Sequence, residues 1–210
     1  MDIAIPIYDR LAALDAVGPY EVLCRLPGAK VTFVAETPGP VQTETRMLTL
    51  VAEASFADLQ RPEVVVVPGG LGNRELLEKS GLVDWIRAAH ETTTWTTSVC
   101  TGSLILAAAG VLDGVEATTH WLARDELREL GAVPVEDRVV ERGKVITAAG
   151  VSAGIDMALT LVARMAGDEV AQAIQLGIEY DPQPPFEAGS PAKAPDQVVE
   201  LVTRLASQYA

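Results

Sequence analysis

The sequence predicts an α/β protein whose central sheet is mostly parallel and covered by helices on both faces. Short runs rich in β-branched residues alternate with longer stretches of helical periodicity along the 210 residues. The run EVVVVPGG (63–70) is continuously apolar, which is typical of a central strand buried on both faces. Strands and helices that alternate in this way are joined by right-handed crossovers and form a mostly parallel sheet.

The first 91 residues alternate predicted strands with predicted helices. Apolar and β-branched residues form short runs there, and turn-forming residues separate the runs. The Pro-Gly-Pro in TPGPVQT predicts that residues 37–43 turn the chain. In order, the patterns predict a strand over 2–8, a helix over 15–26, a strand over 30–36, a short extended piece over 48–51, a strand over 63–70 and a helix over 80–91.

The second half continues the alternation and then changes character. Residues 180–195 contain five prolines and show no periodicity. We expect a semi-rigid surface loop there, or alternatively a segment that folds over the functional site or a dimer partner. One domain is expected over residues 1–210, with this loop inside it. The other patterns predict a strand over 93–99, a helix from Thr101, a surface helix over 121–130, a hairpin over 139–149 with its turn at Arg142 and Gly143, a helix over 152–166 and a last amphipathic helix.

Composition narrows the classes of partner and location. The chain has 29 acidic and 16 basic residues and a net charge of -13, so its field repels nucleic acid and anionic membrane surfaces. No apolar stretch approaches the roughly 18 residues of a membrane helix, and the first residues lack the features of a signal peptide. We therefore expect a cytoplasmic protein. Cys24 and Cys100 are too far apart in sequence for a metal-ligand motif, and a disulfide between them is not expected in a reducing compartment.

Cys100 is the first candidate functional residue, because it lies where a predicted strand ends and a small-residue helix begins. In parallel sheets, ligands bind beyond the carboxyl ends of the strands. A thiol at a helix N-terminus meets unpaired N–H groups and the positive end of the helix dipole, which favour the thiolate. The residues that follow, Thr101 to Ser103, are small enough for a substrate to approach. The alternative is that Cys100 packs in the core as a small hydrophobic residue.

Two other segments belong to the same edge of the predicted sheet. The backbone N–H groups of Gly69 and Gly70 could join that of Thr101 in an oxyanion hole, although a Pro-Gly-Gly loop that needs positive φ angles would look the same. Asp15 lies between the first strand and the first helix. It is either a helix N-cap or, if it lies close to Cys100, an acid of the site.

The two histidines and the second cysteine carry weaker signals. His120 could pair with Cys100 in a Cys-His dyad, or it could be a structural histidine. His90 lies at the polar end of a predicted helix and is expected to be solvated. Cys24 lies on the apolar side of its helix and is expected in the core.

Four segments, taken together, resemble the DJ-1/PfpI superfamily: VVVVPGG, SVCTGSLILAAAGVLDG, ATTHW and AAGVSAGIDMAL, in that order. Within it, LDAVGPYEVL, the Cys-Thr pair at 100 and 101, and YDPQPPFEAGSP resemble the isonitrile hydratases. The resemblance implies a flavodoxin-like three-layer sandwich, a homodimer and a strained nucleophilic cysteine at a strand-to-helix elbow.

The resemblance also implies roles for single residues. Cys100 matches the nucleophile, Asp15 the acid beside it and Thr101 the residue after the nucleophile, while His120 matches a histidine that the hydratase reaction does not require. The implied enzyme is a hydro-lyase without metal or other cofactor, which converts a small-molecule isonitrile into an N-substituted formamide through a cysteine thioimidate. Apolar walls are expected around the thiol, with Ile155, Val151 and Trp121 as candidates.

Two alternative functions use the same cysteine. One is a glyoxalase or deglycase acting on an α-oxoaldehyde, or an amidohydrolase, in which His120 would become essential. The other is a sensor without catalytic activity, whose Cys100 thiol is oxidised reversibly.

Overall fold

The computed structural model describes residues 1–78 and 80–206 and divides into two compact units, Met1–Ile178 and Glu179–Ala210. Within the described part of the first unit, seven strands form the main sheet in the order β10-β11-β7-β6-β1-β2-β5. All neighbouring pairs are parallel except β10 and β11, which form an antiparallel hairpin. The mostly parallel sheet is therefore confirmed. The strands are β1 (Asp2–Pro6), β2 (Lys30–Ala35), β5 (Ala54–Ser55), β6 (Val64–Val67), β7 (Trp95–Val99), β10 (Val139–Arg142) and β11 (Val145–Ala148).

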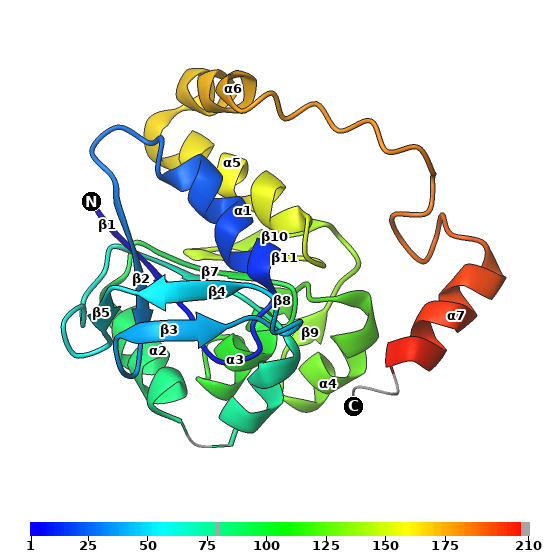
Figure 1. Cartoon of the computed structure of the whole chain (residues 1–210), viewed down its shortest axis with the longest axis horizontal. Helices are drawn as coiled ribbons and strands as arrows, with labels where there is room; N and C mark the ends of the chain where they lie inside the picture. Colours follow the sequence, from blue (N-terminus) through cyan, green and yellow to red (C-terminus); the bar gives the residue numbers. More distant parts are fainter. Residues whose placement is uncertain (79, 207–210) are drawn as a thin grey trace. The chain divides into compact units, whose positions relative to one another are not determined.

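Helices cover both faces of this sheet, which gives the three layers of a flavodoxin-like fold. Figure 1 shows α1 and α5 on one side of the sheet, and α2, α3 and α4 on the other. Short 3-10 helices follow β6 and precede α4, at Leu71–Leu76 and Trp121–Ala123. The α-helices of the first unit are α1 (Ala13–Leu23), α2 (Gly81–Thr92), α3 (Gly102–Ala108), α4 (Arg124–Glu129), α5 (Ala153–Ala166) and α6 (Asp168–Gly177).

The centre of the sheet is apolar, as the run at 64–67 predicts. All four valines of β6 are at most 1% exposed, and they pair with β1 on one side and β7 on the other. Small residues then let two helices approach closely: a Cβ added to Gly18 of α1 would lie 3.2 Å from Ile155 of α5. A Cβ added to Gly154, near the start of α5, would lie 3.0 Å from Val99 and 3.2 Å from Pro19 of α1, so the start of α5 packs against the carboxyl end of β7.

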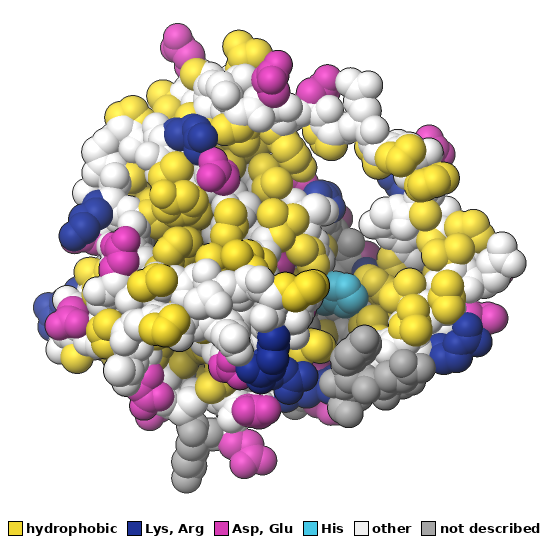
Figure 2. Space-filling model, viewed as in Figure 1, with side chains coloured by type: hydrophobic (Ala, Val, Ile, Leu, Met, Phe, Trp, Pro, Cys, Tyr) yellow, Lys and Arg dark blue, Asp and Glu magenta, His cyan; other side chains and the backbone are white. Residues whose placement is uncertain are grey.

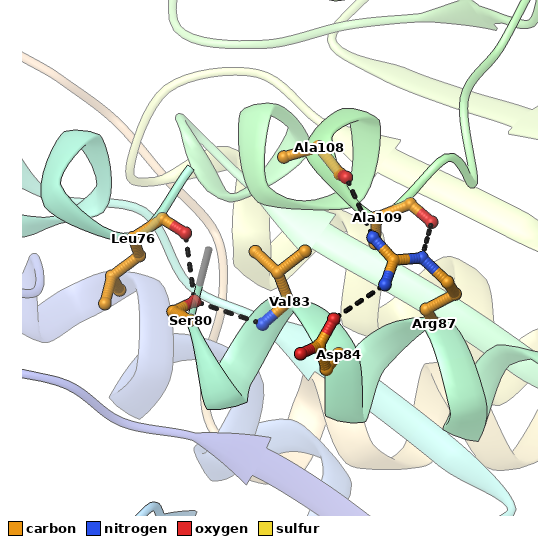
Figure 3. A network of polar contacts seen from close by, with 7 residues as sticks. All are labelled: Leu76, Ser80, Val83, Asp84, Arg87, Ala108 and Ala109. Atoms are coloured by element: carbon orange, nitrogen blue, oxygen red, sulfur yellow. Dashed lines mark hydrogen bonds and ion pairs between the residues drawn. The ribbon is translucent and has the colours of Figure 1, made fainter. Parts of the chain in front are cut away.

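Polar side chains fix α2 and α3 relative to each other, as Figure 3 shows. Ser80 caps α2 by accepting a hydrogen bond from the N–H of Val83 at 3.2 Å. On the same helix, Arg87 donates to the carbonyl oxygens of Ala109 (3.3 Å) and Ala108 (3.4 Å) at the end of α3. A cation at a helix C-terminus satisfies its last carbonyl groups, so α3 is held at its C-terminal end.

Several local expectations are wrong. Residues 37–43 are not only a turn, because β3 (Gly39–Gln42) pairs antiparallel with β4 (Thr49–Ala52) in a separate two-stranded sheet. Pro40 fits there because a two-stranded sheet consists of edge strands, where the missing N–H is tolerated. A further short pair, β8 (Glu116–Ala117) and β9 (Val133–Pro134), and helix α6 had no predicted counterpart.

Two side chains also lie elsewhere than expected. Cys24 is exposed, because α1 ends at Leu23 and the thiol lies past its last turn. His90 is half-buried rather than solvated, and its Nδ1 lies 2.8 Å from the hydroxyl oxygen of Thr96. Burial also lowers the pKa of His90.

The second unit contains helix α7 (Asp196–Ala206), in agreement with the predicted amphipathic helix. No helix or strand occurs over 181–195, the proline-rich segment. Across residues 1–78 and 80–206, no helix combines the length and the hydropathy that crossing a membrane requires.

Candidate active site

Cys100 occupies a strained turn between β7 and α3. Its φ angle is +56°, in the left-handed region that residues other than glycine rarely adopt. Hydrogen bonds hold the turn from both sides: the N–H of Cys100 donates to the carbonyl oxygen of Ala149 at 2.9 Å, while its own carbonyl oxygen accepts from Thr119 (3.0 Å) and Ser103 (3.1 Å). Strain that is fixed by so many contacts is typical of functional positions.

Glycines allow the loop after β6 to contact this turn directly. A Cβ added to Gly102 would lie 2.1 Å from the carbonyl oxygen of Val67. A Cβ on Gly69 would lie 2.5 Å from the backbone nitrogen of Thr101. The chain therefore needs glycine at both positions so that the ends of β6 and β7 can meet.

Asp15 is fully buried at this meeting point, in the first turn of α1. Its Oδ2 accepts a hydrogen bond from the N–H of Gly69 at 2.9 Å, and the carbonyl oxygen of Gly69 accepts from Ala12 at 2.9 Å. Its Oδ1 is buried and has no hydrogen-bond partner within normal geometry among the described residues. Asp15 is not the N-cap, because the helix starts two residues before it and Ala12 takes that position.

The environment of Asp15 favours the protonated acid. Burial raises its pKa from 3.8 to about 7, and the negative charge of Glu44 adds to the effect. The N–H of Gly69 and the thiol of Cys100 act in the opposite direction. A substantial fraction of Asp15 therefore carries a proton at neutral pH.

The Cys100 thiol is also held in its protonated form. Burial raises its pKa, and the charge of Asp15 raises it further. The backbone N–H groups of Val151 and Thr101 and the hydroxyl of Thr101 oppose this shift. The N–H donors expected at the helix start are thus present, but burial outweighs them. The thiol and the Asp15 carboxyl form a coupled pair in which each influences the proton of the other.

Gly69 and Gly70 lie at the site but do not point free N–H groups into it. The N–H of Gly69 donates to Asp15, and that of Gly70 donates to Thr101 Oγ1 at 3.0 Å. Both N–H groups expected in an oxyanion hole therefore already donate to protein oxygens. They position the acid and the hydroxyl instead.

Asn73 and Glu44 were not identified from the sequence. Asn73 is 3% exposed, and its side-chain amide donates to the carbonyl oxygen of Thr101 at 3.3 Å. The sequence signal that could have indicated Asn73 is its polar side chain directly after the glycine-rich loop. Glu44 acts on Asp15 from the turn between β3 and β4, which no sequence spacing indicates.

His120 lies next to the site without contacting the thiol. Its ring packs against Gly150, where an added Cβ would lie 2.9 Å from the ring, and its Nδ1 accepts from the N–H of Leu122 at 3.4 Å. Burial lowers its pKa, so the ring is neutral at pH 7. No hydrogen bond found among residues 1–78 and 80–206 joins this ring to Cys100.

The three residues expected as apolar walls differ in exposure and surroundings. Val151 is 37% exposed and adopts a φ of +26°, Ile155 is half-buried against α1, and the Trp121 ring lies 6.0 Å from that of His120 between centroids. On the face seen in Figure 2, hydrophobic side chains gather over α1 and α5. No group of three or more His, Cys, Asp or Glu that could hold a metal ion occurs in the described part of the chain.

Comparisons with known proteins agree with this architecture. The model of the DJ-1/PfpI family matches residues 1–164. The isonitrile hydratase of Pseudomonas putida is 44% identical over 207 residues, which cover 99% of this chain and 90% of that protein. The crystal structure of a THiJ/PfpI family protein from Pseudomonas syringae, 38% identical, superposes with a TM-score of 0.95 over 99% of this chain and 86% of that chain. Drosophila melanogaster DJ-1beta shares the fold, with a TM-score of 0.77, 24% identity and coverage of 85% of this chain and 97% of that one.

Proposed function

Because the chain belongs to the DJ-1/PfpI family, we propose that it is an isonitrile hydratase, which converts R–N≡C into the formamide R–NH–CHO. The alignment with the Pseudomonas putida enzyme extends over 99% of the chain. The observation that carries the proposal is the buried pair of Cys100 and Asp15, in which a carboxyl with a pKa of about 7 lies beside a thiol.

The first step adds the thiol to the terminal carbon of the isonitrile. Asp15 accepts the proton of Cys100, and the sulfur then forms a bond to that carbon. Asp15 returns the proton to the same carbon, which gives the thioimidate R–N=CH–S–Cys100. The free Oδ1 of Asp15 supports this role, because Oδ2 is engaged by Gly69 and Oδ1 is available for the proton.

The second step releases the product. Water attacks the thioimidate carbon and gives one proton to Asp15, which passes it to the substrate nitrogen. The C–S bond then breaks, the new hydroxyl group gives its proton through Asp15 to the sulfur, and the formamide leaves. The sum is one isonitrile plus one water giving one formamide. The cycle as written uses only Cys100, Asp15 and water.

Neighbouring residues support the two reacting groups. Thr101 interacts with the sulfur through its N–H and hydroxyl, and the bond from Gly70 fixes that hydroxyl. Leu14 (41% exposed) directly precedes Asp15 in the chain. The backbone N–H of Val151 (37% exposed) interacts with the thiol of Cys100. These side chains suit an apolar substituent on the isonitrile.

The test is loss of the isonitrile infrared absorbance when the protein is incubated with cyclohexyl or p-nitrophenyl isocyanide, with the formamide identified by NMR. We expect turnover by the wild type and none by Cys100→Ser. Cys24→Ser is the matched control, because it removes the exposed thiol and should retain activity. Turnover by Cys100→Ser would exclude the thioimidate route. No turnover by the wild type would exclude these isonitriles as substrates.

A further inference from the structure

The hairpin of β3 and β4 is attached to the segment just before α1, the helix that carries Asp15. Leu11, four residues before Asp15, forms a parallel bridge with Thr43 on one side and an antiparallel bridge with Gly70 on the other. The N–H of Glu44 donates to the carbonyl oxygen of Leu11 at 2.9 Å. The end of β3, the start of α1 and the loop after β6 therefore form one hydrogen-bonded assembly.

Thr43, the residue of the hairpin that bridges to Leu11, is buried and hydrogen-bonded. Thr43 is 1% exposed, and its hydroxyl donates to the carbonyl oxygen of Leu48 at 3.0 Å across the hairpin turn. Glu44, the next residue, is half-buried. Its backbone is thus fixed beside the segment that precedes Asp15, and its side chain is partly shielded from solvent.

We propose that Glu44 is a positioning residue whose charge shifts the shared proton of the catalytic pair toward Asp15 and so increases the population of the nucleophilic thiolate of Cys100. The inference deepens the proposed function and rests on it for the reaction. Its electrostatic part can be tested without any substrate.

The charge of Glu44 is available for this purpose. Two arginines on the segments that meet here, Arg46 and Arg10, pair with other carboxylates: Arg46 with Asp9 at 3.2 Å, and Arg10 with Glu75 at 3.7 Å. Within residues 1–78 and 80–206, no ion pair involves Glu44. Its negative charge is therefore not neutralised by a bonded cation.

This charge acts on Asp15, and also on Tyr8, more than on Cys100. It raises the pKa of Asp15, whereas the shift of the Cys100 pKa comes from burial and from Asp15. The other groups facing Asp15 are the Cys100 thiol and the Tyr8 phenol, whose pKa is raised by burial, so it stays neutral at working pH. When the pair holds one proton, Glu44 thus favours the form with Asp15 protonated and Cys100 as thiolate, relative to the form with Asp15 ionised and Cys100 as thiol.

Removing this charge should have two opposite effects. Activity rises with pH as the pair goes from two protons to one, and Glu44→Gln should move this rise to lower pH, because Asp15 then loses its proton more readily. Above the rise, the rate should fall about threefold to tenfold, because the thiolate form is less populated. Local distortion would lower the rate without moving the rise.

The experiment measures two rates against pH in a Cys24→Ser background, so that Cys100 is the reacting thiol: alkylation by iodoacetamide, and hydration of cyclohexyl isocyanide. The variants are Glu44→Gln, the charge-conserving Glu44→Asp, and Glu53→Gln, which removes an exposed carboxylate at the end of β4. We expect both effects in Glu44→Gln alone, with Glu44→Asp and Glu53→Gln close to the background protein.

The outcomes separate the two proposals. Alkylation profiles that coincide for Glu44→Gln and Glu53→Gln would overturn the role of Glu44, whatever the hydration rates are. A shifted alkylation profile in a protein that hydrates no isonitrile would support the electrostatic role of Glu44 and reject the proposed function. A Glu44→Asp profile that matches Glu44→Gln would show that the charge is not the cause, and would also overturn the inference.

Discussion

The backbone N–H of Gly69 donates to Oδ2 of Asp15 at 2.9 Å, while Oδ1 of the same carboxyl is buried without a partner that meets normal geometry among the described residues. The loop after β6 therefore fixes the acid through one oxygen and leaves the other for the proton that the chemistry moves. A buried acid of this kind costs stability whenever it is ionised.

Asp15→Asn should make the protein more stable at neutral pH. The unfolded chain ionises Asp15 near pH 3.8, and the folded chain holds its proton up to about 7. Between these values the unfolded state binds fewer protons, so the stability of the wild type falls as pH rises. The asparagine lacks this loss, which amounts to about 4 kcal/mol at most. Denaturant unfolding of both proteins from pH 4 to pH 7.5 measures the difference.

The difference should vanish at the acid end of this range and level off above about pH 7. Hydration should be lost in Asp15→Asn at every pH, because the amide cannot carry the proton. A gap between the two proteins that widens toward low pH would contradict the assignment of Asp15 as a buried, protonated acid.

Thr101→Val should reduce both stability and activity. The valine has nearly the same shape, but it removes the oxygen that accepts the N–H of Gly70 at 3.0 Å. An unsatisfied buried N–H costs about 1–3 kcal/mol. The hydroxyl that lowers the pKa of Cys100 is lost as well. Urea titrations and hydration rates measure the two effects.

Thr101→Ser is the matched variant, since it retains the hydroxyl, and it should behave like the wild type in both assays. Loss in the serine variant without loss in the valine variant would mean that the methyl group, and not the hydroxyl, matters at this position.

Gly102→Ala should destabilise the protein by about 3 kcal/mol or more, because the new Cβ would lie 2.1 Å from the carbonyl oxygen of Val67, a backbone atom that cannot move aside cheaply. Gly177→Ala, at the end of α6, is the control: no atom lies within 4 Å of its Cβ, and replacing a helical glycine should stabilise by about 0.5–1 kcal/mol. Thermal unfolding of both variants and the wild type measures these changes in stability. A Gly102→Ala protein as stable as the control would show that the contact of β6 with the elbow is loose.

The sequence predicts the main sheet because the decisive signals are local. The apolar run at 64–67 and the alternation of strand and helix patterns need no knowledge of distant contacts. The strand β3 was missed because Pro-Gly-Pro is a turn signal, whereas the proline is tolerated here only because its strand lies at an edge. The exposure of Cys24 was missed because it depends on the residue at which α1 ends.

The candidate site divides in the same way. Cys100 and Thr101 follow from their place at a strand end, but the burial that raises the pKa values of Cys100 and Asp15 depends on three segments that meet only in the fold. The bonds that occupy the N–H groups of Gly69 and Gly70, and the effect of Glu44, are likewise tertiary. Sequence spacing indicates which residues reach the edge of the sheet, and not what each of them binds there.

His120→Gln should leave hydration of isonitriles essentially unchanged. Burial lowers the pKa of the ring, so no imidazolium is available at pH 7 to stabilise the thiolate, and glutamine can still accept the N–H of Leu122. An enzyme acting on α-oxoaldehydes through Cys100 would instead need His120 for proton transfer. Measuring hydration of cyclohexyl isocyanide and consumption of methylglyoxal by wild type and His120→Gln separates the two functions. Loss of hydration in a folded His120→Gln protein would show that the imidazole takes part in the proton transfers that we assign to Asp15 alone.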